Sequence, residues 1–83
     1  MALSNTAINN AKPKDKNYRL YDEKGLYLEI TKAGGKLWRL KYRFGSKEKR
    51  LAIGSYPERG LKAAREARDQ ARTQLSNGID PSA

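Results

Sequence analysis

The sequence contains no cysteine and no histidine. Without cysteine there is no disulfide framework, thiol nucleophile or thiolate metal site, and without histidine the commonest general base and zinc ligand are missing. A chain of 83 residues also buries only about 60% of the surface that its unfolded form exposes, so an elaborate catalytic cleft is not expected. We therefore expect no catalytic residue, no metal site and no cofactor.

Long apolar runs are absent as well. No stretch approaches the roughly 18 consecutive apolar residues that a membrane span requires, and residues 1–5 lack the charged and apolar regions of a signal peptide. These features predict an intracellular, soluble protein with a cytoplasmic location and no membrane partner.

Acidic residues are few relative to basic ones. The chain has 18 Lys and Arg against 9 Asp and Glu, a formal net charge of +9. Residues 25–60 alone hold nine basic and three acidic side chains. This segment also has the clearest strand patterns, so the charge is expected on ordered structure and not on a disordered tail. Such a balance suits an anionic partner.

The first quarter of the chain predicts two short elements. Ser4 can cap a short helix that ends before Lys12-Pro13, because proline disfavours the helical conformation in the residue before it. Residues 18–21 are a candidate short strand, and residues 22–25 have turn chemistry.

The middle of the chain alternates with the period of half-buried strands. Residues 26–31, 36–44 and 47–54 are the predicted strands, and Gly45-Ser46 between the last two suits a type II′ hairpin turn. If Phe44 pairs with Lys47, Leu40 faces Leu51, Trp38 faces Ile53 and Arg43 faces Glu48. The same register opposes Lys41 to Arg50, a like-charge pair that costs up to about 1 kcal/mol.

Residues 61–76 have the spacing of an amphipathic helix with an alanine-rich stripe, followed by the capping pair Asn77-Gly78. A small-residue stripe lets the helix approach a sheet that bears large aromatic side chains. The predicted fold class is α+β: a three-stranded antiparallel sheet, with residues 18–21 as a possible fourth strand, packed on one C-terminal helix and preceded by a short N-terminal helical turn. The other sheet face is expected to be uncovered.

The uncovered face is predicted to be basic. An ordinary solvated surface is the alternative, but the charge imbalance, the like-charge pair and the concentration of arginine favour a binding role. A two- or three-stranded ribbon fits the roughly 12 Å major groove of duplex DNA, whereas single strands are read mainly by exposed aromatics. The candidate contacts to bases or phosphates are Arg39, Lys41, Arg43 and Arg50, with Tyr27 on sugar or a thymine methyl, and Lys36, Lys47 and Lys49 on backbone phosphates at the strand ends.

Two other functions remain open at this stage. The composition suits an RNA-binding or ribosome-associated module equally well, and the bare sheet could serve as a protein-interaction surface. Competition between duplex DNA and structured RNA separates the first from DNA binding, and weak salt sensitivity identifies the second.

The order of several motifs resembles a known family. They are, in chain order, Asn10-Ala11-Lys12-Pro13, Tyr18-Arg19-Leu20-Tyr21-Asp22, Gly25-Leu26-Tyr27-Leu28, Lys36-Leu37-Trp38-Arg39 with Tyr42-Arg43, Leu51-Ala52-Ile53-Gly54-Ser55-Tyr56-Pro57, Ala63-Ala64-Arg65 and Gly78-Ile79-Asp80-Pro81. The chain resembles the N-terminal arm-type DNA-binding domain of prophage and genomic-island integrases, which are tyrosine recombinases. Gly60 departs from the pattern, because a serine-like helix cap is expected there.

The resemblance implies a non-catalytic module that binds arm-type sites in double-stranded DNA during integration and excision. It implies residues 1–17 as an N-terminal segment with a short helix, 18–78 as the arm-binding domain, and 79–83 as the start of a linker to absent core-binding and catalytic domains. No tyrosine here should inherit the nucleophile's role. Partners implied for the parent protein are other integrase subunits and DNA-bending accessory proteins, in the bacterial cytoplasm near the nucleoid.

Overall fold

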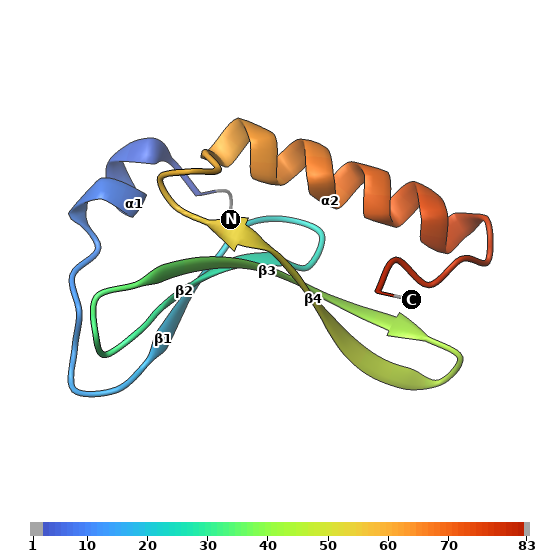
Figure 1. Ribbon diagram of the computed structural model, residues 1–83, viewed down its shortest axis with the longest axis horizontal. Helices are drawn as coiled ribbons and strands as arrows, with labels where there is room; N and C mark the ends of the chain where they lie inside the picture. The colour runs from blue at the N-terminus through green and yellow to red at the C-terminus, as the bar shows by residue number, and fades with distance from the viewer. Residues whose placement is uncertain (1–2, 83) are drawn as a thin grey trace.

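The computed structural model describes residues 3–82. In chain order its elements are α1 (Asn5–Asn10), β1 (Tyr18–Tyr21), β2 (Leu26–Ile30), β3 (Lys36–Phe44), β4 (Lys47–Ser55) and α2 (Leu61–Ser76). The strands form one antiparallel sheet in the order β1-β2-β3-β4, and Figure 1 shows both helices on the same side of it. The predicted α+β fold is confirmed, and residues 18–21 are the fourth strand. No helix within residues 3–82 is long and apolar enough to cross a membrane.

The helix ends follow from local hydrogen bonding. In α1 the Ala7 amide donates to Ser4 Oγ at 3.2 Å, as an N-terminal cap. At the start of α2, Gly60 supplies no side-chain cap. At its end Gly78 has φ +78°, and the Ile79 amide donates to the Gln74 carbonyl at 2.8 Å. These are the features of a Schellman motif, in which glycine adopts the left-handed conformation that ends the helix.

From the hairpin turn to Arg39, the β3–β4 register is the predicted one. From Trp38 to the start of β3, the prediction is wrong. Leu40 faces Leu51 and Lys41 faces Arg50, but Trp38 faces Gly54 and not Ile53, because a one-residue irregularity follows Trp38. Such a bulge adds one residue to one strand and leaves it without a partner. The Arg59 side chain fills the position that a side chain at Gly54 would occupy, with its Nε 3.1 Å from the place of an added Cβ. The Trp38 Nε1 donates to the Arg59 carbonyl at 2.7 Å.

The hairpin turn also differs in type from the prediction. Both central residues have positive φ, +56° at Gly45 and +71° at Ser46. That combination defines a type I′ turn, whereas type II′ requires positive φ only at the first central residue. Both types match the twist of the strands, so the register set by the turn is unaffected.

The core lies between α2 and the sheet, with α1 closing one end. Ile8 of α1 is fully buried against Trp38, and Ala64 and Ala71 of α2 lie against the large side chains Trp38 and Tyr42 in two adjoining clusters. This is the match of small helix residues to large sheet residues that the sequence predicted.

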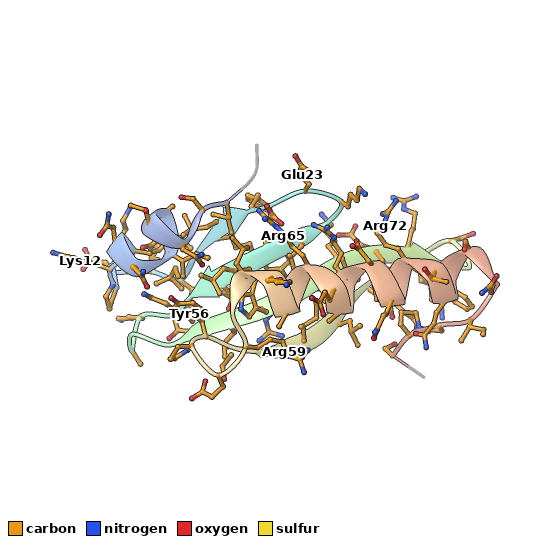
Figure 2. All side chains as sticks on the ribbon, turned by 90° about the horizontal axis from the view of Figure 1, so that it is seen from above. Lys12, Glu23, Tyr56, Arg59, Arg65 and Arg72 are labelled. Atoms are coloured by element: carbon orange, nitrogen blue, oxygen red, sulfur yellow. The ribbon has the colours of Figure 1, made fainter. Side chains whose placement is uncertain are left out.

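A buried carboxylate ties α2 to the β1–β2 turn. Asp22 Oδ2 accepts from Arg65 Nε at 2.9 Å and from Arg68 at 3.1 Å, while Oδ1 accepts from the Leu3 amide at 2.9 Å. Figure 2 shows Arg65 reaching from α2 toward the turn that carries Glu23. Burial raises the pKa of Asp22, but the Arg65 hydrogen bond, the Leu3 amide and the Arg65 charge outweigh it, so the pKa lies below its ordinary value.

Candidate nucleic-acid interface

The sheet face opposite the helices is here called the open face, because no other element of residues 3–82 covers it (Figure 1). The strand registers place alternate residues of all four strands on it. Its charged and aromatic members are Arg19, Tyr21, Tyr27, Glu29, Arg39, Lys41, Arg43, Glu48 and Arg50. Five are cationic and two are anionic, so the face has a net positive charge.

The β3–β4 half of the open face is solvent-exposed. Lys41 lies directly opposite Arg50, as predicted. Glu48 faces Arg43 in the register, yet its carboxylate pairs with Lys41, Nζ to Oε1 at 2.9 Å, with both side chains 50% exposed. The hydrogen bond from Lys41, followed by the Lys41 charge, lowers the pKa of Glu48. One acidic side chain thus offsets part of the repulsion between Lys41 and Arg50.

The β1–β2 half is packed. Tyr27 lies on the open face as predicted, but it is fully buried. The Arg19 guanidinium lies 4.9 Å from its ring centroid, and the Tyr21 ring lies 5.8 Å away at an interplanar angle of 49°. Tyr27 therefore supports its neighbours and has no surface of its own for DNA. Tyr21, which is 60% exposed, is the accessible aromatic of this half.

Arg39 links the two halves. It lies opposite Tyr27 on one side and opposite Ala52 on the other. Its Nε lies 3.7 Å from Glu29 Oε1, and its side chain is 32% exposed. Arg39 is therefore held by a charge on its own face and still reaches solvent.

The three lysines predicted at the strand ends lie on the helix-bearing side of the sheet by register. The Lys36 ammonium donates to the Ile8 carbonyl at 2.8 Å, and Lys49 pairs with Asp80. Lys47 is exposed beside the hairpin turn. Phosphate binding by these lysines stays a prediction, and DNA reaching Lys36 or Lys49 would have to extend round the ends of the strands.

The Lys49–Asp80 pair is part of a clasp on the residues after α2. Tyr42 Oη donates to Asp80 Oδ1 at 2.6 Å and lies 2.7 Å from Ser82 Oγ. The pKa of Asp80 lies far below its usual range because of hydrogen bonds, of which the one from Lys49 has the largest effect, followed by those from Tyr42 and the Ser82 amide. The segment predicted as the start of a linker is therefore held against the hairpin as far as Ser82.

Sequence reasoning missed Arg19 and Tyr21 as members of the surface. The signal was present: residues 18–21 alternate, with Tyr18 and Leu20 facing the helices and the other two facing away. It went unused because the faces of this strand were not assigned. The buried Asp22 cluster had no comparable signal.

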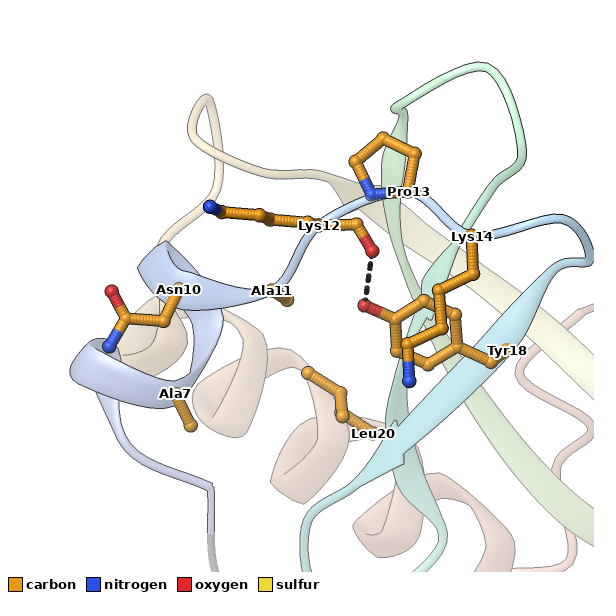
Figure 3. A pocket seen from close by; sticks show the side chains of 8 residues that line it. All are labelled: Ala7, Asn10, Ala11, Lys12, Pro13, Lys14, Tyr18 and Leu20. Atoms are coloured by element: carbon orange, nitrogen blue, oxygen red, sulfur yellow. Dashed lines mark hydrogen bonds between the residues drawn. The ribbon is translucent and has the colours of Figure 1, made fainter.

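A cavity of about 430 Å³ lies between α1 and β1, lined by Ala7, Asn10, Ala11, Lys12, Pro13, Lys14, Tyr18 and Leu20. Figure 3 shows the Tyr18 hydroxyl directed at the Lys12 carbonyl, to which it donates at 2.6 Å. No carboxylate is among the residues that line it. Within residues 3–82 no group of three carboxylate, histidine or cysteine side chains is placed to hold a metal ion.

Comparison with known proteins agrees with this geometry. A family model described as an arm DNA-binding domain matches residues 3–83. The integrase of Enterobacteria phage P4 is 49% identical over 83 residues, 98% of this chain and 19% of that protein. The integrase of Shigella phage Sf6 and prophage integrase IntS of Escherichia coli K12 are each 49% identical over 74 residues, 89% of this chain and 19% of theirs. The chain thus spans only a small part of these curated relatives. The resemblance drawn from the motifs is confirmed, and the chain belongs to the arm DNA-binding domain family.

Proposed function

We propose that this domain binds duplex DNA at arm-type sites of a site-specific recombinase by placing the open face in the major groove. The observation that carries the proposal is the opposed pair Lys41 and Arg50 on an uncovered face. A purely structural hairpin has no use for a like-charge pair, whereas a polyanion removes the repulsion when it binds.

The shape of the face supports the major groove as the docking site. The β3–β4 hairpin is a two-stranded ribbon of nine residues per strand, and the groove is about 12 Å wide, which admits such a ribbon. Single-stranded binding is less well supported, because the face exposes Tyr21 but buries Tyr27 and therefore offers no series of aromatic platforms.

The rest of the parent protein is part of the same proposal. Because the chain covers 19% of its integrase relatives, strand exchange belongs to regions outside it in a tyrosine recombinase. The domain anchors that enzyme to DNA, with residues 79–83 as the start of the connection. Other subunits and DNA-bending proteins complete the assembly.

The test is a binding titration with duplexes selected from a random 20-base-pair library, followed by fluorescence anisotropy over a salt series. Displacement of counterions by about three to five phosphate contacts of the open-face cations gives a slope of log affinity against log salt of roughly −2.7 to −4.5. Arg43→Gln with Arg50→Gln should lower affinity and reduce the slope by about two.

The control is Lys62→Gln, an exposed substitution on α2, which lies on the other side of the sheet. It should leave both affinity and slope close to those of the parent. A slope near zero, or tighter binding of a structured RNA competitor, would contradict the proposal.

A further inference from the structure

The β1–β2 half of the open face, together with Arg39 of β3, contains a group of side chains with no counterpart in the rest of the β3–β4 half, which we call the hairpin half. We call this group the arginine–tyrosine cluster; its members are Arg19, Tyr21, Tyr27, Glu29 and Arg39. Each arginine contacts the tyrosine ring or the glutamate. None of the three cations of the hairpin half lies on an aromatic ring of the open face.

Both guanidinium groups of the cluster are held in position. Arg19 lies on the Tyr27 ring at 4.9 Å and faces Glu29 across the β1–β2 register. Arg39 lies on the other side of Tyr27, with its Nε 3.7 Å from the Glu29 carboxylate. Arg19 is stacked on a ring and Arg39 is paired with a carboxylate, so each has already lost part of its rotamer freedom and loses less when it binds.

The cluster also has unused hydrogen-bonding capacity. Tyr27 Oη and Arg39 Nε are buried and have no hydrogen-bond partner within the described residues. Buried polar atoms are nearly always paired in folded proteins, so two orphans in one cluster indicate that a further polar group completes it. Ala52, opposite Arg39, is too small to block an approach to the Arg39 side chain from the β4 side.

Resting on the proposed function, we propose that Arg19 and Arg39 determine sequence specificity by contacting base edges, while Lys41, Arg43 and Arg50 bind phosphates. A planar guanidinium fixed in orientation matches the O6 and N7 acceptors of guanine in a two-bond contact. Exposed cations suit phosphates, because a phosphate contact needs charge more than orientation. The exposed Tyr21 lies beside Arg19 and excludes water from that contact.

Charge-conserving substitutions separate the two roles. In Arg19→Lys and Arg39→Lys the positive charge remains, but the two-bond fork is lost. The matched control is Arg43→Lys, on the same face and strand as Arg39. Affinity is measured by anisotropy for the selected duplex and for a scrambled duplex of equal length, and the specificity ratio is compared.

We expect Arg19→Lys and Arg39→Lys each to reduce the specificity ratio on the order of ten- to a hundredfold. Affinity for the scrambled duplex and the salt slope should stay unchanged, because the charge is conserved. Arg43→Lys should leave the ratio within about twofold. Thermal melts followed by Trp38 fluorescence establish that each variant is folded. If Arg39→Lys is destabilised, the comparison is made with Arg19→Lys alone, because Arg19 is on an edge strand.

The outcomes distinguish this inference from the proposed function. An unchanged ratio in both cluster variants, or a loss confined to Arg43→Lys, overturns the inference and leaves duplex binding intact. If the parent domain selects no duplex and shows no salt dependence, the proposed function itself fails.

Discussion

Replacing Asp22 with asparagine should destabilise the domain more than any other single change of charge. The Asp22 side chain is completely buried and accepts hydrogen bonds from Arg65, Arg68 and the Leu3 amide. Asparagine keeps the shape but removes the negative charge, and its amide group turns a donor toward guanidinium groups that can only donate. Arg68, 8% exposed, then keeps only the exposed Asp69 as a charged partner.

The expected cost follows from that burial. Removing one partner of a buried ion pair costs about 3–5 kcal/mol, and we take the lower end because Arg65 is partly exposed and can turn to water. A domain of this size has a total stability of about 4–12 kcal/mol. A loss of about 3 kcal/mol lowers the melting temperature by about 12–24 °C.

The pH dependence gives a second signature. Because the folded pKa of Asp22 lies below its ordinary value, its contribution is fully present above the unfolded pKa of about 3.9. It is lost as the pH falls through the folded pKa. Other carboxylates also have a lowered pKa, among them Glu48 and Asp80, and their protonation in acid lowers the stability of parent and variant alike. The difference in unfolding free energy between parent and variant therefore reports on Asp22.

The assay is urea unfolding followed by the fluorescence of Trp38, the single tryptophan, which is fully buried. Titrations at pH 7, 5, 4 and 3 should show a gap that is constant down to about pH 5 and then narrows. Asp69→Asn is the control, because Asp69 also accepts from Arg68, at 3.0 Å, but its side chain is 58% exposed; its effect should be much smaller. A variant as stable as the parent at pH 7, or a gap that persists unchanged at pH 3, would refute the reasoning.

Three further predictions concern the sheet. Trp38→Ala should cost about 3–5 kcal/mol, measured by circular dichroism during urea unfolding, because it removes the largest side chain between sheet and helix; melting like the parent would contradict this. Gly25→Ala should destabilise by about 1–3 kcal/mol in the same assay, because Gly25 has φ +86° and an added Cβ would lie 2.4 Å from the Lys41 carbonyl oxygen; Gly45→Ala, with φ +56° but open space, should cost less. Lys41→Thr should melt close to the parent, since it loses the Glu48 pair but relieves repulsion with Arg50, while DNA affinity falls; a destabilised variant with unchanged affinity would show that Lys41 has another role.

Sequence periodicity was sufficient for the architecture, because each element carries a strong local signal. The bounds of α2 follow from its alanine stripe and the Asn77-Gly78 cap, and the structure has the same bounds. The hairpin register follows from a two-residue turn, since a slip of one residue moves every apolar side chain to the wrong face. The prediction failed at Trp38, where a bulge adds a residue that alternation alone does not reveal.

The site was less predictable, because exposure depends on neighbours that are distant in the chain. Alternation placed Tyr27 on the open face correctly, but its burial depends on Arg19 and Tyr21 from another strand. The pairing of Lys49 could not be predicted for the same reason, since its partner Asp80 is 31 residues away. Nor does periodicity identify Arg68 as buried, because a charged residue beside the alanine stripe is ordinarily solvated.

One face of the sheet stabilises the fold and the other is available for binding, and a comparison of free energies explains why the two roles can be separate. The repulsion between Lys41 and Arg50 costs at most about 1 kcal/mol, whereas the side chain of Trp38 on the helix side contributes about 3–5 kcal/mol. The helix-bearing side can therefore tolerate an unfavourable charge pattern on the open face. Tyr27 is the exception, because it is buried on the open face and supports Arg19 there. Residues of the hairpin half can change with little effect on folding, but the arginine–tyrosine cluster couples the stability of the sheet to the geometry of its DNA contacts.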